Sequence, residues 1–537
     1  MKTYWNGNEF QMVSQLVSPV AVKAEHEVRY PERILLEKEP CQSFSVDDMV
    51  GLREPGAYIV LDFGKEVCGG IRLITRIVDS GSATLRITLG ESVTEACSNI
   101  GEKNATNHHS PRDFTALISN LSDLTFGQSG FRFARIELVS GSGVWFRSVY
   151  AVNNLPWIAN EGKLTTDDQL VNQIFDTAAY TLKLCCQNGY IWDGIKRDRL
   201  VWCGDLHPEI VSSMYIMGDN ANVRNSLSIL RRETKEGEWI NRIPSYCAWW
   251  VINLCDYCSF SGNMEFFQEG KQFARDILER FDRETAEDGA IDFKTDSTNN
   301  PFFLDWPTAQ TEDAKIGTAV LIRYAAQKFL VFEECEAATR LVHKLRNYLD
   351  MPCKHKCVRA FQILAGRRHA DDAAFLEAGG AKGISTFMAY YIFKANVIAG
   401  GKKSLEILKE YFGSMLERGA TTFWEDFNVE WLEGSGRIDE FPAEGVRDIH
   451  GDYGAFCYSG LRHSLCHGWS SGVLAFLVEE ILGLRLADGG KTAYIVPDMA
   501  GLKDMDASIP VSGGMLHIAI HNGEVKVDAP EGIRVCL

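Results

Sequence analysis

The sequence lacks several features that mark membrane, secreted or nucleic-acid-binding proteins. It has no run of eighteen apolar residues, so no spanning helix is expected. The first residues, MKTYWNGNEFQMVSQ, hold no apolar core of signal-peptide length. Basic residues are outnumbered, 55 against 72 acidic ones, and the net charge is −17. This balance argues against binding nucleic acid or an anionic membrane, since both need a basic surface.

A disulfide framework is also lacking. The fifteen cysteines are odd in number and scattered, a pattern typical of reduced thiols in a chain of 537 residues. We therefore expect free cysteines and a cytoplasmic location. Residues 353–357 hold metal-type side chains, but no second pair lies at structural-zinc spacing, so we expect a solvated loop and no metal. No Walker loop and no HExxH motif occurs.

What is present indicates a multidomain chain with α and β parts, because 537 residues exceed one compact core. Residues 1–157 alternate polar and apolar side chains over short runs separated by turn residues, which predicts an N-terminal β-sandwich. Two runs, 82–89 and 131–138, show this alternation, and 57–64 is an apolar strand with a turn signal. Residues 488–537 return to strand-like patterns, with a hairpin turn at 521–523, and predict a small C-terminal β-domain.

Helical periodicity dominates between these ends, over residues 158–487. A helix-start signal at 165–168 precedes apolar residues at helical spacing. Further helices are predicted at 208–217, 221–233, 245–260, 264–281, 311–331, 334–348, 384–399 and 402–417. Helical hairpins with functional loops at one end favour an (α/α)6 barrel. A helical solenoid is the alternative, although no fixed sequence period supports it.

The densest group of chemically useful side chains lies at residues 192–209. This segment holds four carboxylates, two arginines and two tryptophans, and glycines interrupt it, so we expect a loop before a helix. Indole faces stack on the apolar face of a pyranose, and carboxylates accept protons from its hydroxyls. The pattern favours sugar binding. A solvated loop of salt bridges is the alternative.

A second candidate is Glu425, which follows a tryptophan in a threonine-rich, aromatic segment. An acid in this setting is a candidate general base. The alternative is a helix start, in which Thr421 or Thr422 is the N-cap and Glu425 completes a capping box. The two interpretations do not exclude each other.

Two further groups place a polar residue beside an indole. His467 lies two residues before Trp469, and the alternative there is a helix start with a buried histidine. Asp305 directly precedes Trp306, and the alternative is an ordinary turn before the helix expected near residue 311.

Taken together, and in their order along the chain, these motifs resemble those of glycoside hydrolase family 78, the α-L-rhamnosidases. The likeness spans nearly the whole chain. Segments 61–66, 90–92 and 130–133 resemble the accessory β-domain of that family. The other residues that carry the resemblance are Asp193, Arg197, Asp198, Arg199, Leu200, Trp202, Gly204, Asp205, the Thr-Thr-x-Trp-Glu run at 421–425 and the histidine loop at 464–469.

The resemblance implies the three domains named above, 1–157, 158–487 and 488–537, with the barrel as the catalytic domain. It implies hydrolysis of terminal α-L-rhamnosides with inversion, Asp198 being the general acid and Glu425 the general base. A small carbohydrate or glycoside would be the substrate, with no metal or organic cofactor; a homo-oligomer stays open. The expected substrate-binding residues, including tryptophans beside candidate acids, are Asp193, Arg197, Trp202, Asp205, Asp305, Trp306, Trp424, His467 and Trp469.

Three positions depart from the family pattern. Asp198 stands where many relatives have glutamate, Val201 replaces a usual glycine, and Cys203 replaces a usual threonine. An aspartate is one methylene shorter, so the backbone would have to bring its carboxyl closer. These departures keep two alternatives open: a six-hairpin enzyme acting on another sugar or as a lyase, and a non-catalytic sugar-binding relative.

Overall fold

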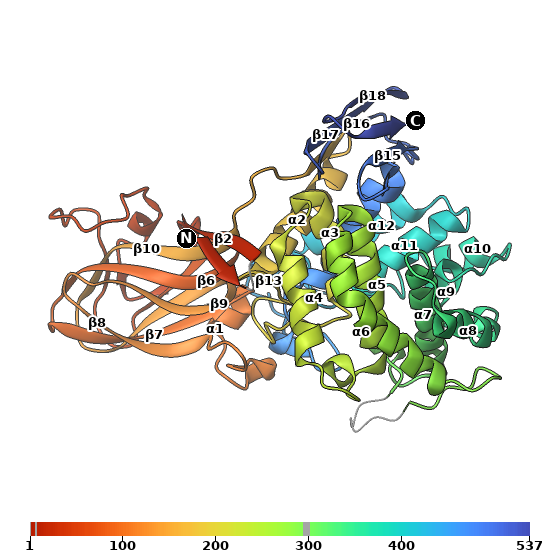
Figure 1. Ribbon diagram of the computed structural model, residues 1–537. Coiled ribbons are helices and arrows are strands. Elements are labelled where there is room, and N and C mark those ends of the chain that lie inside the picture. Colours follow the sequence, from red (N-terminus) through yellow and green to blue (C-terminus); the bar gives the residue numbers. More distant parts are fainter. Residues whose placement is uncertain (1, 6–7, 294–300) are drawn as a thin grey trace.

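The computed structural model describes residues 2–5, 8–293 and 301–537. The N-terminal strands form a β-rich part at one end, the helices form the body, and the last strands lie at the top of that body in the view of Figure 1. None of the helices in the described part combines the length and apolarity that crossing a bilayer needs.

The N-terminal part is one sheet of ten strands in the order β1-β2-β10-β6-β9-β7-β8, with β3, β4 and β5 joining at its side. Its inward side chains form one apolar core. The strands are β1 (Lys2–Trp5), β2 (Asn8–Val17), β3 (Ala21–His26), β4 (Val28–Arg29), β5 (Val50–Leu52), β6 (Tyr58–Val78), β7 (Ser82–Gly90), β8 (Asp113–Ser119), β9 (Asp123–Ser140) and β10 (Val144–Pro156). A short helix, α1 (Val93–Cys97), follows β7.

The three predicted strands lie inside β6, β7 and β9, but β6 and β9 are longer than expected. The sequence suggests a turn at Gly64, whereas the structure carries β6 past it through an irregularity between Asp62 and Val67. Gly64 has φ +76, which glycine adopts at little cost. Gly69 lies so close to β10 that a Cβ there would be 2.1 Å from the Val152 carbonyl oxygen. Both glycines keep a long strand continuous where a turn was expected.

The helical body holds twelve α-helices among the described residues. The list is α2 (Gln169–Cys185), α3 (Leu206–Met217), α4 (Ala221–Glu233), α5 (Pro244–Ser261), α6 (Met264–Arg283), α7 (Glu312–Leu330), α8 (Glu336–Lys344), α9 (Lys356–Leu364), α10 (Asp372–Glu377), α11 (Ala389–Ile398), α12 (Ser404–Glu417) and α13 (Gly472–Phe476). The helix-start signal is confirmed, since Asp168 caps α2 by accepting from the amides of Leu170 and Val171. The predicted helix at 334–348 is divided: α8 ends at Lys344 and a 3-10 turn, Arg346–Leu349, follows.

Helix packing explains the burial patterns. α3 packs on α5, α5 on α7, α7 on α9, α9 on α11, α11 on α13 and α13 on α3. α5 is buried on nearly every side, as expected for a helix that is apolar all round. α6 is strongly amphipathic, because it covers α5 from outside and presents its charged face to solvent.

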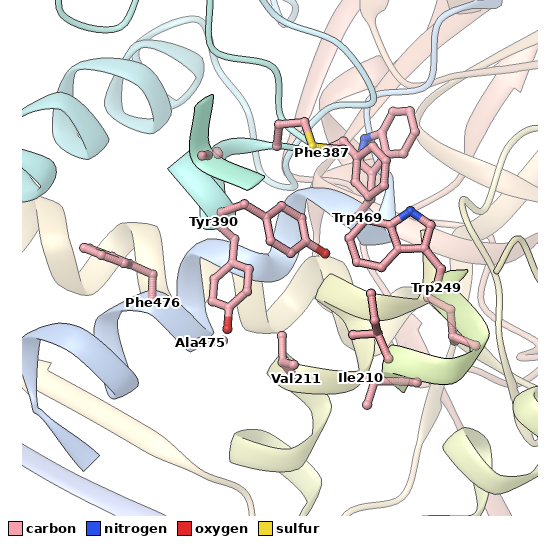
Figure 2. Close-up of a cluster of buried hydrophobic side chains, with 14 of the residues drawn as sticks. Ile210, Val211, Trp249, Phe387, Tyr390, Trp469, Ala475 and Phe476 are labelled. Carbon is pink, nitrogen blue, oxygen red and sulfur yellow. The ribbon is translucent and has the colours of Figure 1, made fainter. Parts of the chain in front are cut away.

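Large apolar side chains fill the space between these helices. Figure 2 shows Trp249 of α5, Phe387 just before α11, and Trp469 before α13 in one buried cluster. The rings of Phe387 and Trp469 stack at 4.9 Å with an angle of 10° between their planes. A Cβ at Gly472 would lie 2.9 Å from the Tyr390 Cβ, so the glycine allows α13 to approach α11 closely.

The last strands form two small sheets. One has the order β11-β16-β17-β18 and the other β14-β15-β19. The predicted hairpin turn is confirmed: Asn522 and Gly523 join β17 and β18 with φ +50 and +85, as a type I′ turn requires. β11 and β14 come from residues before 488, so these sheets use chain from both sides of the predicted boundaries. The strands are β11 (Lys163–Thr166), β14 (Leu484–Ala487), β15 (Thr492–Ile495), β16 (Asp504–Val511), β17 (Gly514–His521), β18 (Glu524–Asp528) and β19 (Arg534–Cys536).

Candidate active site

Three loops of the helical body meet at the candidate site: 192–205 before α3, 421–428 after α12, and 463–468 before α13. Backbone hydrogen bonds join them. The Gly468 amide donates to the Asp193 carbonyl at 2.6 Å, and the His467 amide donates to the Phe423 carbonyl at 3.0 Å. Segments far apart in the sequence are thus fixed against one another by main-chain contacts, and their side chains converge.

One guanidinium group contacts both candidate catalytic carboxylates. Arg197 donates from Nη1 to Asp198 Oδ1 at 3.1 Å and from Nη2 to Glu425 Oε1. Each carboxylate has a second donor: Trp202 Nε1 lies 3.2 Å from Asp198 Oδ2, and the Ser464 amide lies 3.1 Å from Glu425 Oε2. The Asp198 side chain is 19% exposed and that of Glu425 only 4%. The fold therefore brings the pair together, with Asp198 nearer to solvent.

The backbone at Asp198 is in the left-handed region, with φ +55, and Arg199 follows with φ +58. Such conformations cost energy in residues other than glycine and gather at functional sites. The Asp198 amide donates to His109 Nδ1 at 2.7 Å. His109 comes from the N-terminal part and is exposed, and no motif marks it in the sequence. Only the tertiary fold reveals that it touches the candidate acid.

Buried acids surround the pair. Burial raises the pKa of Asp193 well above its usual range, and the nearby Asp198 and Asp205 carboxyls raise it further. Burial also raises the pKa of Asp205 to about 8, although it accepts a hydrogen bond from the Tyr246 hydroxyl at 3.1 Å. At neutral pH the Asp205 carboxyl is mostly protonated, so it can donate as well as accept hydrogen bonds.

His467 lies at the centre of this group. Its Nε2 is 3.8 Å from Asp193 Oδ2, 4.0 Å from Asp205 Oδ1 and 3.8 Å from Glu425 Oε1. Burial and the charge of Arg197 lower its pKa well below the usual value, so the imidazole is neutral. Its Nδ1 is buried and has no hydrogen-bond partner. The alternative of a buried histidine at a helix start also holds, since a 3-10 helix, Gly468–Ser471, begins directly after it.

The four tryptophans expected at the site differ in burial. Trp202 and Trp306 are half-buried, and Trp306 stacks on the exposed Phe456 at 5.7 Å. Trp424 and Trp469 are buried, at 1% and 4% exposed. The Trp469 Nε1 donates to the Glu425 carbonyl at 2.9 Å and so helps to fix the backbone of the candidate base. In this structure two of the four indoles have surface available to a ligand.

Asp305 lies on a separate loop. It caps a 3-10 turn, Trp306–Thr308, as the alternative interpretation expected, and accepts from Ser385 Oγ at 2.5 Å. Burial raises the pKa of Asp305 to about 6. Between it and Glu425 lies Asp426, whose pKa burial raises to about 7. Asp426 was missed as a site residue, although its position directly after Glu425 could have suggested it.

Two of the alternative interpretations are wrong. Segment 192–209 is no solvated loop, because Asp193, Arg197 and Asp205 are at most 6% exposed. No helix begins within residues 421–428: the next one, a 3-10 turn at Val429–Leu432, is capped by Asn428, and Thr422 Oγ1 donates to the Leu465 carbonyl at 2.7 Å. Both segments are buried connections whose polar side chains are held by tertiary contacts.

Comparison with known proteins gives a consistent result. Residues 159–331 match the family described as bacterial alpha-L-rhamnosidase 6 hairpin glycosidase domain. No curated protein sequence matches the chain. Among solved structures, the family-78 rhamnosidase of Bacillus sp. GL1 superposes with a TM-score of 0.71 at 19% identity, covering 94% of this chain and 55% of that one.

Two further structures carry L-rhamnose or rhamnose. The Klebsiella oxytoca rhamnosidase gives a TM-score of 0.67 at 19% identity, over 87% of this chain and 96% of that one. The Streptomyces avermitilis α-L-rhamnosidase gives 0.68 at 14% identity, over 98% and 50%. The chain thus spans about half the length of some of these proteins and nearly all of another. The resemblance to the six-hairpin glycosidases of glycoside hydrolase family 78 is therefore confirmed.

Proposed function

We propose that this protein hydrolyses terminal α-L-rhamnosides, with Asp198 as general acid and Glu425 as general base. The observation that carries the proposal is the contact of Arg197 with both carboxylates, which lie far apart in the sequence. Glycoside cleavage needs one carboxyl to protonate the leaving oxygen and a second to activate water. The choice of rhamnose as the sugar rests on the names of the similar structures.

The two carboxyls are held in ways that suit these roles. Glu425 receives hydrogen bonds from Arg197 and from the Ser464 amide, and these two donors fix the position of its carboxylate. Asp198 is more exposed, so it lies where a leaving group departs toward solvent. With inversion, the water stands between Glu425 and the anomeric carbon, and such pairs are about 6.5–9.5 Å apart.

The surrounding side chains suit a neutral sugar. The protonated Asp205 and the neutral His467 can exchange hydrogen bonds with sugar hydroxyls without adding charge, and burial favours the neutral form of Asp193 as well. The half-buried indole of Trp202 offers a face for the ring. Asp305 and Trp306 would then contact a more distant part of the substrate.

The finer architecture belongs to the same proposal. The closed series α3, α5, α7, α9, α11 and α13 supports an inner ring of an (α/α)6 barrel, with α4, α6, α8, α10 and α12 outside it. The free state of all fifteen cysteines supports a cytoplasmic location. Neither a metal nor an organic cofactor has a part in the proposed reaction.

A panel of aryl glycosides tests the function. We expect release of nitrophenol from the α-L-rhamnoside well above that from other hexosides and deoxyhexosides. Proton NMR of the first-formed sugar should show the inverted anomer. A retained anomer would overturn the base role of Glu425, because a retaining enzyme uses its second carboxylate as a nucleophile.

A non-catalytic sugar-binding protein is the second candidate. The observation in its favour is that Arg197 pairs with both carboxylates at once, while the candidate acid is the shorter aspartate. Saturable binding of L-rhamnose without turnover of any glycoside in the panel would select this function.

A further inference from the structure

A buried ion network connects the N-terminal sheet to the candidate site. Glu91 directly follows β7, and Glu95 lies on α1. Lys196 Nζ is 3.0 Å from Glu91 Oε2 and 3.2 Å from Glu95 Oε1. Both carboxylates are at most 1% exposed and Lys196 is 6% exposed. The contacts join two separate parts of the fold where no solvent can replace them.

Glu91 also holds the loop that supports the candidate base. The Leu465 amide donates to Glu91 Oε2 at 2.6 Å, and Ser464 Oγ donates to Glu91 Oε1 at 3.1 Å. The amide of the same Ser464 donates to Glu425 Oε2, and the Glu425 amide donates back to the Ser464 carbonyl at 2.9 Å. Ser464 therefore contacts both Glu91 and the candidate base, Glu425.

Lys196 holds the other half of the site. It directly precedes Arg197 and Asp198 in the chain. Its ammonium donates to the Leu461 carbonyl at 3.1 Å and to the His463 carbonyl. Lys196 thus anchors both the loop with the candidate acid and the loop that binds the candidate base. Glu91 pairs with the charge of Lys196.

The same acids have the geometry of a metal site. Ligand atoms of Glu91, Glu95 and His450 lie within 4.8 Å of one another among the described residues. The Lys196 ammonium lies against two of them and supplies the positive charge. His450 Nδ1 contacts Ser92 Oγ at 2.7 Å, and its Nε2 contacts the His463 carbonyl at 2.9 Å. The charges and hydrogen-bonding groups of these residues are therefore matched within the protein itself. Their contacts hold the surrounding segments together.

We propose that Glu91 is a positioning residue for the reaction proposed above, on which this inference rests. It sets the distance and angle between Asp198 and Glu425 through two routes, Lys196 and the Ser464 amide, without touching substrate. The N-terminal sheet then contributes to catalysis indirectly, by positioning the two carboxyls. Because an error of about 1 Å in such a pair can cost on the order of 10²-fold in rate, removing the anchor lowers kcat more than it changes KM.

The main test compares Glu91→Gln with Asp282→Asn. Asp282 is a matched control, since it is 7% exposed and pairs with Arg340 at 2.8 Å and Lys344 at 3.0 Å on the outer helices, without contact to the site loops. Both variants lose one buried charge. We expect Glu91→Gln to lower kcat on nitrophenyl α-L-rhamnoside by about 10–10²-fold with KM changed less than about threefold. Asp282→Asn should lose thermal stability while keeping kcat.

Hydrogen exchange followed by mass spectrometry gives a readout that does not depend on activity. Glu91→Gln should speed exchange in segments 195–199 and 463–466, and Asp282→Asn should not. If the wild type hydrolyses no glycoside, the proposed function fails while this measurement still decides whether Glu91 holds the loops. Should Glu91→Gln fold poorly, Ser464→Ala removes the hydroxyl bond to Glu91, together with two contacts to the Cys466 backbone inside the same loop, and leaves the Ser464 amide in place. A several-fold loss of kcat with faster exchange is expected. Unchanged exchange and unchanged kcat in the folded variants would overturn the inference.

Discussion

Two fully buried carboxyls of the helical body have opposite electrostatic surroundings. Glu479 lies in the π-helical turn Leu477–Ile481 that follows α13. It accepts from the Tyr215 and Tyr390 hydroxyls at 3.0 and 2.8 Å and pairs with the Lys394 ammonium at 2.5 Å. Burial alone would raise its pKa, but these donors bring the pKa below the usual value. Asp205, in front of α3, has no ammonium or guanidinium within ion-pair distance among the described residues, and burial raises its pKa to about 8.

The difference separates structural acids from acids available to a ligand. Tyr390 belongs to the packed cluster of Figure 2. Its hydroxyl, the Tyr215 hydroxyl and the Lys394 ammonium all bind the Glu479 carboxylate. Around Asp205 and Asp193 hydrogen-bonding capacity remains, and the nearby His467 Nδ1 has no partner. Buried polar groups are costly when unsatisfied, so their concentration at one place indicates a site where a substrate completes the hydrogen bonding.

The largest effect expected at the unsatisfied region comes from the candidate base. Glu425→Gln should lower kcat by about 10²–10⁴-fold on every substrate, because water activation does not depend on the leaving group. Steady-state kinetics on an activated aryl glycoside and on an alkyl glycoside measure it. A similar loss in Glu479→Gln would break the comparison, since that acid should affect folding alone.

The candidate acid gives a smaller effect that depends on the substrate. Asp198→Asn should reduce kcat strongly for alkyl glycosides and less for nitrophenyl glycosides, since a good leaving group needs little protonation. The ratio of the two losses is the quantity to measure. Equal losses for both leaving groups would contradict the acid role and leave Asp198 as a binding residue.

The tryptophans sharpen the same contrast between core and site. Trp424 packs edge-on against Phe427 and is 1% exposed, so Trp424→Ala should lower the free energy of unfolding by about 3–5 kcal/mol. Half-buried Trp202 contacts Asp198, and Trp202→Ala should weaken substrate binding by about 1–3 kcal/mol. Urea unfolding and KM measure the two effects. A stable Trp424→Ala variant with a raised KM would place that indole in the pocket.

Much of the fold could be predicted because local patterns determine it. Alternation located strands inside β7 and β9, an apolar run located the start of β6, and the capping aspartate located the start of α2. Strand lengths were missed where glycines carry β6 through an irregularity instead of ending it. The ends of the helical part were harder, because β11 and β14 join sheets built mainly from the last residues, and such pairing is set by tertiary contacts.

The candidate site was predictable only in part. Motifs identified Asp198 and Glu425, and the structure brings both onto Arg197. Burial of Trp424 could not be derived from its neighbours in sequence, because a tryptophan beside an acid is equally common in a core and in a sugar site. Glu91 lies in segment 90–92, which carries part of the family resemblance, but no local pattern indicates that Glu91 or His109 contacts the site loops. Both lie in the N-terminal part and reach the site only through the fold.

The smallest expected effect is a difference in how stability depends on pH. The folded protein keeps a proton on Asp205 up to about pH 8, whereas the unfolded chain loses it near pH 4. Between these values the folded state binds more protons, so this group makes the free energy of unfolding fall as pH rises, by at most about 1.4 kcal/mol per pH unit. Asp205→Asn should flatten that decline.

Glu479 should act in the opposite direction, because its pKa is lower in the folded state than in the unfolded chain. The stability that its ionised form contributes is present above the unfolded pKa of about 4.3 and is lost as pH falls through the folded value. Glu479→Gln should therefore flatten the acid side of the profile, and Asp205→Asn the side from pH 4 to 8. Urea unfolding at half-unit pH steps measures both. If both variants flatten the same side, Asp205 has an ionic partner after all and the distinction between the two acids fails.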